Sequence, residues 1–238
     1  MKPPRSERLT LPGPAGSLEA LIEIPVSDGD GVMADGAPAA FGVVCHPHPL
    51  YGGTLDNKVV YTLARAFVEC GAPTIRFNFR GVGASAGRYD EGRGETEDAL
   101  AAIAYGRQRW PGAALWLAGF SFGAAVAVRA AQCAPPEKLV TVAPGITRVV
   151  MQGVVPPRCP WLLVQGDADE VIEPAAVLEW AERQSVTPGI GPQIRIFPGG
   201  GHFFHGRLHE LRQTVVRFLT DKSTGFAPRT PSDPLVNA

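Results

Sequence analysis

The stretch Ala114-Leu-Trp-Leu-Ala-Gly119-Phe-Ser121-Phe-Gly123 decides the fold, because it joins a strand pattern to a helix pattern through a single serine. Residues 114–118 form an apolar run typical of a buried strand, and residues 122–133 are alanine-rich and apolar all round, as in a central helix. A serine on such a strained turn needs neighbours without Cβ atoms, because the strand and helix backbones pass close by. The pattern G-x-S-x-G in this context predicts an exposed nucleophilic hydroxyl at Ser121, rather than a passive serine in a glycine-rich turn.

Alternating strand and helix patterns extend from this turn toward both ends of the chain. Further strands are predicted at 7–12, 17–25, 41–45, 73–79, 138–143, 161–165 and 193–197. Further helices are predicted at 57–70, 95–110, 174–184 and 209–221. The first two strands read as an antiparallel pair, and the rest alternate with helices. The pattern predicts an α/β fold with a mostly parallel sheet of about eight strands and helices on both faces.

The chain of 238 residues shows one hydrophobic core in its pattern and no internal repeat. Residues 1–222 therefore read as a single domain. The segment 26–39 reads as a surface loop rich in Gly, Asp and Ala, and residues 223–238 contain three prolines and read as a disordered tail. The segment 144–159 between two predicted strands is irregular, which predicts that no sizeable lid covers the site.

Composition excludes several classes of function. The formal net charge is −1 and no run of five like charges occurs, so a basic face for nucleic acid is not expected. No apolar stretch approaches the ~18 residues of a membrane span, and the N-terminus lacks a secretory pattern, so we expect a cytoplasmic protein. A homodimer is compatible with the sequence. The cysteines lack a CxxC pair and read as small buried hydrophobes in a reducing compartment; they are Cys45, Cys70, Cys133 and Cys159.

A serine hydroxyl is a weak nucleophile and needs an adjacent base. Among the five histidines, His202 follows the run Gly199-Gly-Gly201 directly after the last predicted strand. A loop there can present an imidazole over the carboxyl edge of the sheet, so His202 is the predicted base. His205 is the alternative, and His209 opens the final predicted helix, where a surface or dipole-related role is expected.

The base needs a carboxylate that holds its tautomer and stabilises the imidazolium. Asp169 is the predicted acid, because the short loop after strand 161–165 carries it to the sheet edge where Ser121 lies. Asp167 is the next candidate, although it also reads as a turn residue that bonds its own backbone. Glu170 and Glu173 read as residues that start the following helix. The chain order Ser…Asp…His matches the strand-turn-helix type of site.

Acyl transfer also requires an oxyanion hole. One donor is predicted to be the amide of Phe122, the residue after the nucleophile, and the other should come from the loop after strand 41–45. The two prolines of that loop have no N–H to donate. Leu50 or Tyr51 is therefore expected, with His48 as a further alternative.

The pair His46 and His48 has the spacing of a two-histidine metal motif. No third ligand lies nearby in the sequence, and the serine site needs no metal, so neither a metal nor an organic cofactor is expected.

These motifs resemble the α/β-hydrolase superfamily over about residues 8–220. The resemblance rests on four stretches, which are Gly119-Phe-Ser-Phe-Gly123, Gly166-Asp-Ala-Asp169, Gly200-Gly-His202 and Arg80-Gly-Val-Gly83-Ala-Ser85-Ala-Gly87. Within the superfamily, His46-Pro-His-Pro-Leu-Tyr-Gly-Gly53 and Asp56-Asn-Lys-Val-Val60 look like small bacterial hydrolases related to dienelactone hydrolases and serine aminopeptidase-like enzymes. Dienelactone hydrolases use a cysteine nucleophile, whereas this chain carries Ser121, which favours ordinary ester hydrolysis.

The sequence therefore predicts a serine hydrolase, specifically a carboxylesterase that cleaves small ester substrates through an acyl-enzyme on Ser121 with His202 and Asp169. The first alternative is a peptide or amide hydrolase with the same three residues. The second is a non-catalytic member of the fold that binds ligands or partners.

Overall fold

The computed structural model describes residues 3–26, 37–147, 151, 153–185 and 191–221. Its eight strands form one sheet in the order β1-β2-β4-β3-β5-β6-β7-β8. The strands are β1 (Arg5–Gly13), β2 (Gly16–Ile24), β3 (Ala40–Cys45), β4 (Thr74–Phe77), β5 (Ala114–Phe120), β6 (Lys138–Val142), β7 (Trp161–Gly166) and β8 (Gln193–Phe197). β1 pairs with β2 and β2 with β4 in antiparallel fashion, and every other neighbouring pair is parallel. The predicted α/β fold is confirmed.

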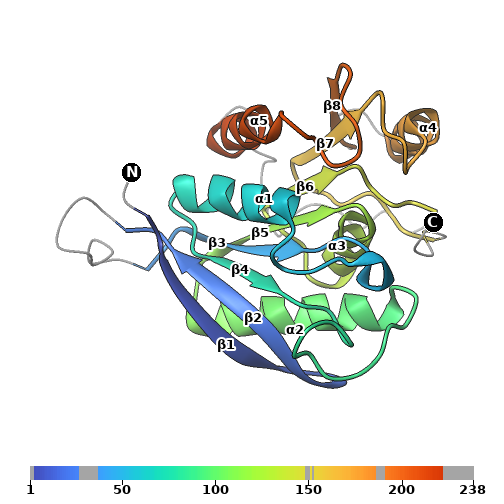
Figure 1. Ribbon diagram of the computed structural model, residues 1–238. Helices are drawn as coiled ribbons and strands as arrows, with labels where there is room; N and C mark the ends of the chain where they lie inside the picture. Colours follow the sequence, from blue (N-terminus) through green and yellow to red (C-terminus); the bar gives the residue numbers. More distant parts are fainter. Residues whose placement is uncertain (1–2, 27–36, 148–150, 152, 186–190, 222–238) are drawn as a thin grey trace, which may run out of the picture.

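Helices cover both faces of the sheet, as Figure 1 shows. The helices are α1 (Lys58–Glu69), α2 (Arg93–Arg109), α3 (Phe122–Cys133), α4 (Pro174–Gln184) and α5 (Leu208–Thr220). The apolar sides of α1 and α5 share one core cluster, and those of α2, α3 and α4 share the cluster on the opposite face. Because each face is buried, the central strands β3, β4 and β7 have no exposed residue. β3 reads in the sequence as an apolar run, whereas β4 contains Thr74 and Arg76 and β7 ends in Gln165 and Gly166.

The strand predicted at 73–79 ends earlier, at Phe77. The amide of Phe79 donates to the imidazole Nε2 of His46 at 3.0 Å, so it cannot continue a strand ladder. The side chain of Asn78 turns to two other segments, where it accepts from the Leu55 amide and donates to Glu19. The end of β4 is thus set by side-chain hydrogen bonds from distant residues, which apolar patterning does not report.

Between β6 and β7 the described residues contain no helix or strand, which confirms that the fold has no sizeable lid. The loop predicted at 26–39 and the tail predicted at 223–238 lie mostly or wholly outside the described residues. No helix in the described ranges is both long and apolar enough to cross a membrane.

The prediction that all four cysteines are buried is wrong. All four are free thiols, but only Cys45 on β3 is fully buried. Cys70 and Cys159 are half-buried, and Cys133 is exposed because it ends α3 at the surface. Burial raises the pKa of the Cys45 thiol well above its ordinary value, so this thiol stays protonated at neutral pH.

A buried ion pair ties β2 to β4 at the antiparallel side of the sheet. The guanidinium of Arg76 lies 3.2 Å from the carboxylate of Glu23, which is only 3% exposed. Arg76 also donates to the carbonyl of Leu55 and lies over the ring of Tyr61. Each charge also has a longer second ion pair, Arg76 with Asp56 at 3.5 Å and Glu23 with Arg65 at 4.0 Å. Removing Glu23 or Arg76 therefore breaks the one pair in which both charges are fully buried.

We expect Glu23→Ala to lower the free energy of unfolding by about 3 kcal/mol, because Arg76 would lose its buried carboxylate partner and keep only the exposed Asp56. The matched control is Glu179→Ala, which breaks the exposed pair between Glu179 and Arg183 and should change stability by less than about 1 kcal/mol. Urea denaturation of both variants measures the difference. Equal losses in the two variants would contradict this account of the buried pair.

Candidate active site

The serine of the G-x-S-x-G motif occupies a strained backbone position between β5 and α3. Ser121 has a φ of 55° and a ψ of −121°, a region that a residue with a Cβ rarely occupies. A Cβ at Gly119 would lie 2.1 Å from the carbonyl oxygen of Gly123, and a Cβ at Gly123 would lie 2.3 Å from that of His46. Both contacts are impossible, so the two glycines are required for the turn to close. The Ser121 amide donates to the Val142 carbonyl on β6, which anchors the turn to the sheet.

The structure brings the three residues predicted to form the triad into one chain of hydrogen bonds. Nε2 of His202 lies 3.1 Å from Oγ of Ser121, and Nδ1 of His202 lies 2.8 Å from Oδ2 of Asp169. All three residues are buried, and His202 is 2% exposed. They come from the loops that follow β5, β7 and β8, whose carboxyl ends meet at one edge of the parallel sheet.

The environment of Asp169 favours its ionised form. Burial opposes ionisation, but hydrogen bonds from His202 and from the amides of Ile172 and Val171 outweigh it, and the pKa of Asp169 lies below its ordinary value. The two amides donate to Oδ1 at 2.8 and 2.9 Å, and Oδ2 faces His202. An ionised carboxylate only accepts hydrogen bonds, so Nδ1 of His202 must carry a proton and Nε2 is left to accept one from Ser121.

The loop that carries Asp169 is also joined to the histidine loop at other points. Oδ1 of Asp167 accepts from the Gly199 amide at 2.6 Å, and Oε2 of Glu170 accepts from the His202 amide at 3.1 Å. The Ala168 amide donates to the Gly200 carbonyl at 3.1 Å. The backbone of His202 is therefore held by one carboxylate and its imidazole by the next, which fixes the ring relative to Ser121.

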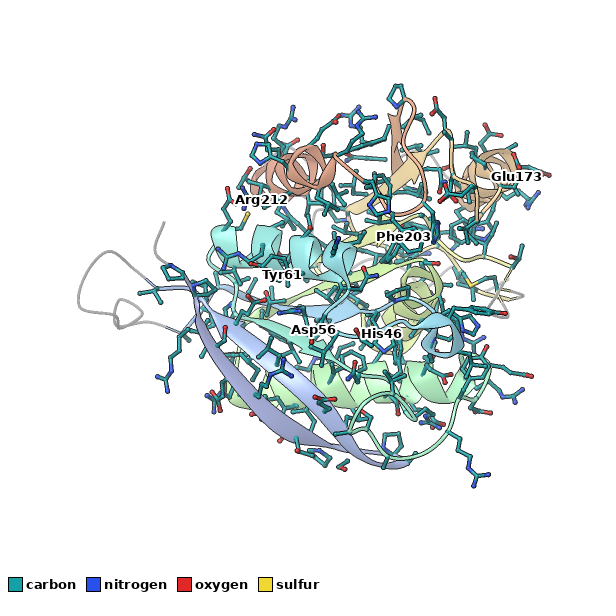
Figure 2. All side chains as sticks on the ribbon, in the orientation of Figure 1. His46, Asp56, Tyr61, Glu173, Phe203 and Arg212 are labelled. Carbon is teal, nitrogen blue, oxygen red and sulfur yellow. The ribbon has the colours of Figure 1, made fainter. Side chains whose placement is uncertain are left out.

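Two readings of this acidic loop need correction. Asp167 does not bond its own turn, since its partner lies 32 positions along the chain. Glu170 does not start the following helix, because α4 begins only at Pro174 and the Glu170 carboxylate is used by the His202 amide, which lowers the pKa of Glu170. Glu173 does directly precede α4, and Figure 2 labels its side chain there. The sequence carried no signal for the partners of Asp167 and Glu170, because both contacts join loops that meet only in the folded sheet.

The loop predicted to supply the second oxyanion donor is a rigid turn. The Leu50 amide donates to Nδ1 of His48 at 3.2 Å, and the Tyr51 amide donates to the His48 carbonyl at 3.1 Å. Both predicted donors therefore already have acceptors inside the loop, and their side chains are 65% and 74% exposed. The His48 ring lies 4.9 Å from the Phe122 ring, measured between centroids. The side chain of His48, the remaining alternative in the loop, therefore packs against the side chain of Phe122.

His46 anchors the same loop from inside the protein. Its Nδ1 lies 2.6 Å from the Pro47 carbonyl and its Nε2 accepts from the Phe79 amide, so the ring is neutral with the proton on Nδ1. Burial is the main reason that the pKa of His46 falls to about 4. The ring nitrogens of His46 face the Pro47 carbonyl and the Phe79 amide, whereas those of His48 face the Leu50 amide and the Tyr89 hydroxyl. Among the residues that the structure describes, no group of three or more His, Cys, Asp or Glu side chains could hold a metal ion.

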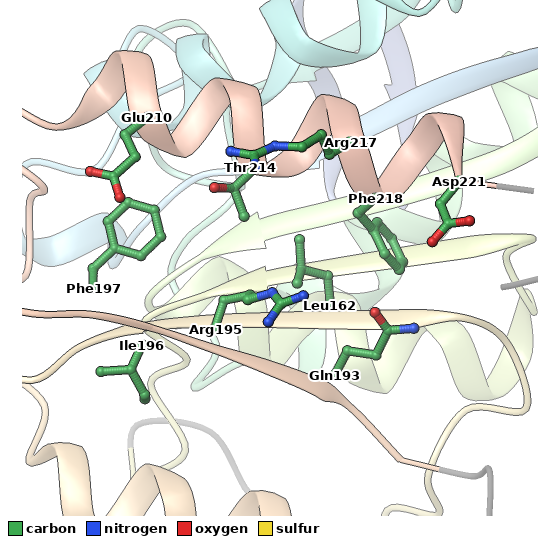
Figure 3. A pocket seen from close by; sticks show the side chains of 10 residues that line it. All are labelled: Leu162, Gln193, Arg195, Ile196, Phe197, Glu210, Thr214, Arg217, Phe218 and Asp221. Atoms are coloured by element: carbon green, nitrogen blue, oxygen red, sulfur yellow. The ribbon is translucent and has the colours of Figure 1, made fainter. Parts of the chain in front are cut away.

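A cavity of about 550 Å³ lies away from Ser121, between α5 and the last two strands of the sheet (Figure 3). Side chains of α5 approach it from one side and those of β8 from the other. Its lining residues are Leu162, Gln193, Arg195, Ile196, Phe197, Glu210, Thr214, Arg217, Phe218 and Asp221. None of the residues predicted for catalysis lines this cavity, so it takes no part in the site built on Ser121.

The fold and this site define an α/β serine hydrolase. Residues 52–157 match the family model of the S33 serine aminopeptidases. The chain is 32% identical over 213 residues to the uncharacterized protein RP471 of Rickettsia prowazekii, covering 87% of this chain and 86% of that protein. The chain belongs to the α/β-hydrolase superfamily, and the predicted resemblance to that superfamily is confirmed.

Two solved structures are similar over nearly their whole length. One is XC6422 from Xanthomonas campestris, a serine hydrolase of this type without a lid; it is 39% identical, with 97% of this chain and 99% of that chain covered and a TM-score of 0.82. The other is an α/β serine hydrolase homologue from Coxiella burnetii, which is 42% identical, with 90% and 97% covered and a TM-score of 0.80.

We expect His46 to make the protein less stable as the pH falls. Its pKa is about 4 in the folded protein against an ordinary value of 6.5, so the unfolded chain binds the proton more readily. The contribution of His46 to the free energy of unfolding is complete above pH 6.5. It is lost progressively as the pH falls toward 4, by about 3 kcal/mol in total.

The variant His46→Gln tests this expectation by urea denaturation across pH 4 to 7. It should be less stable than the wild type at pH 7, because the bond to the Phe79 amide is weakened, and its stability should fall less steeply with acid. An unchanged slope below pH 6.5 would show that another group causes the acid sensitivity.

Proposed function

We propose that this protein is a carboxylesterase that cleaves small esters through an acyl-enzyme on Ser121. One observation carries the proposal, namely the continuous line of hydrogen bonds from Oγ of Ser121 through both nitrogens of His202 to the carboxylate of Asp169, at 3.1 and 2.8 Å. These distances lie within the reach required of a nucleophile, its base and the group that orients the base.

In the proposed first half-reaction, Oγ of Ser121 attacks the ester carbonyl carbon while Nε2 of His202 takes the hydroxyl proton. The carbonyl oxygen becomes an oxyanion, which the amide of Phe122 at the first position of α3 can stabilise together with a donor from the loop 46–53. The tetrahedral intermediate then breaks its bond to the alcohol oxygen, and His202 returns the proton to that leaving oxygen. The acyl group remains on Ser121.

In the second half-reaction, a water molecule attacks the acyl carbon and His202 takes one of its protons. The intermediate expels Oγ of Ser121, which receives the proton from His202, and the carboxylic acid leaves. In both halves His202 becomes a buried imidazolium for a moment, and the ionised Asp169 offsets that charge at 2.8 Å. The low pKa of Asp169 supports this role, because a protonated carboxyl group could not stabilise the imidazolium.

Small or flat substrates fit the surroundings of Ser121 best. The described residues between β6 and β7 form no folded lid that could enclose a long acyl chain. Exposed apolar side chains lie on the two loops that carry His48 and His202, with Leu50 and Tyr51 on the first and Phe203 on the second. The ring of Phe203, labelled in Figure 2, packs edge-on against the His202 ring with centroids 5.1 Å apart.

Amide or peptide hydrolysis is the second candidate, because the match of residues 52–157 to the S33 serine aminopeptidases favours it. The same three side chains serve both reactions. The two differ in the leaving group, since an amine needs protonation by His202 before the bond to carbon breaks, whereas many alkoxides leave with less assistance.

We expect wild-type protein to hydrolyse p-nitrophenyl acetate and butyrate and to be labelled by a fluorophosphonate. Ser121→Ala should lose both, with a fall in kcat of about 10³-fold or more, because no other oxygen occupies the nucleophile position. Circular dichroism of the variant controls for folding. Labelling and turnover that survive in Ser121→Ala would overturn the assignment of all three residues.

Substrate preference is tested by pairs of matched compounds. We expect kcat/KM for butyrate esters to exceed that for palmitate esters, since the described residues between β6 and β7 form no folded lid. We also expect kcat/KM for an ester to exceed that for the matching anilide. Faster hydrolysis of long-chain esters than of acetate and butyrate would contradict the short-chain preference. An anilide cleaved as fast as its ester would support the peptidase alternative.

A further inference from the structure

The side chain of Gln165, near the end of β7, points at the acid of the proposed triad from inside the protein. Gln165 is fully buried, and it was not among the residues singled out from the sequence. We propose that Gln165 is a positioning residue that holds the Asp169 carboxylate in the orientation that His202 requires. This inference rests on the proposed function, because it assigns to Gln165 a role in the same reaction.

Gln165 completes the hydrogen bonding of the Asp169 carboxylate. Its Nε2 donates to Oδ2 of Asp169 at 3.0 Å, the same oxygen that faces Nδ1 of His202 at 2.8 Å. Oδ1 receives the amides of Val171 and Ile172. Each carboxylate oxygen therefore has two donors, one pair from the backbone and one pair from side chains. Without Gln165, Oδ2 would be held by His202 alone, which is the group that the carboxylate has to orient.

The orientation of the Gln165 amide follows from its surroundings. Nε2 also lies 3.1 Å from the Gly166 carbonyl, so it faces two acceptors at once. A flipped amide would place Oε1 against those same two oxygens, with no proton between them. The other end of the amide, Oε1, is buried and meets no donor group among the described protein residues. Both hydrogen bonds of the Gln165 side chain therefore come from Nε2, one to Asp169 and one to the carbonyl of the next residue, Gly166.

Two consequences follow for catalysis if this amide is removed. The carboxylate gains freedom to rotate, so the imidazole is less often aligned with Ser121. Displacements of reacting groups by about 1 Å slow enzyme reactions strongly, because the reaction requires a defined geometry. The carboxylate also loses a hydrogen bond that favours its ionised form, so the pKa of Asp169 rises and the ionised carboxylate is lost at a higher pH. The ionisable groups that face one another here are Asp169, His202 and Glu170, whose carboxylate binds the His202 amide.

The test compares the second-order rate of fluorophosphonate labelling in wild type and Gln165→Met, because labelling reports on Ser121 without a known substrate. Methionine has nearly the same length and volume but no donor. We expect labelling to slow by roughly ten- to hundredfold and the acidic limb of its pH profile to move to higher pH. Circular dichroism and the melting temperature check that the variant is folded, because Gln165→Met removes the unsatisfied amide oxygen but also the donor to Asp169 and to the Gly166 carbonyl. Gln165→Leu gives the same expectations if Gln165→Met yields no folded protein.

Two controls separate positioning from a general effect on structure. Gln184→Met makes the same substitution on α4, where Gln184 bonds the Trp180 carbonyl, and it should change neither rate nor pH profile. In an Asp169→Ala background, Gln165→Met should have no further effect on the rate, because Gln165 acts through Asp169.

The outcomes distinguish this inference from the proposed function. Wild-type labelling with an unchanged rate and pH profile in Gln165→Met would overturn the role of Gln165 alone, as would additive effects with Asp169→Ala. A wild type that is labelled but hydrolyses no ester would overturn the esterase proposal and leave the role of Gln165 standing. A wild type that is never labelled would overturn both.

Discussion

Close approach of backbone to backbone around Ser121 is the constraint on which the rest of the site depends. The residue can hold a φ of 55° only while the surrounding structure compensates the strain. That compensation comes from the sheet, because the Ser121 amide is bound to β6 and Gly123 packs on the carbonyls of Cys45 and His46. The same contact that makes the elbow also places the loop after β3 beside it, so the nucleophile and the proposed oxyanion donors are positioned together.

A second close approach sets the other half of the site. A Cβ at Gly166 would lie 2.1 Å from the Gly200 carbonyl, so the acid loop and the histidine loop can meet only because that position is glycine. Once they meet, Asp169 and Glu170 hold the imidazole and the amide of His202 respectively. The electrostatics follow from the geometry, since a buried carboxylate with four donors stays ionised and offers its charge to the ring. An ordered imidazole is therefore a product of backbone packing as much as of side-chain chemistry.

The sequence predicted the fold and the central residues of the site for one physical reason. Parallel strands alternate with helices, and the loops after successive strands emerge at the same sheet edge, so Ser121, Asp169 and His202 could be grouped without coordinates. The predicted bounds of α3, α4 and β8 agree with the structure. Periodicity failed at the end of β4 and at the exposed Cys133, where a distant hydrogen bond and the end of a helix decided the outcome.

Residue types and their order along the chain thus determined the layered sheet, the strained serine and the histidine and carboxylate that could serve it. Only the tertiary structure decided how the remaining polar groups are used. Gln165 and Glu170 gained their partners, and the amides of Leu50 and Tyr51 were occupied by His48, because hydrogen bonds depend on direction and on distances of about 3 Å. Such directions are set when loops pack against one another, and a linear pattern of residue types carries no record of them.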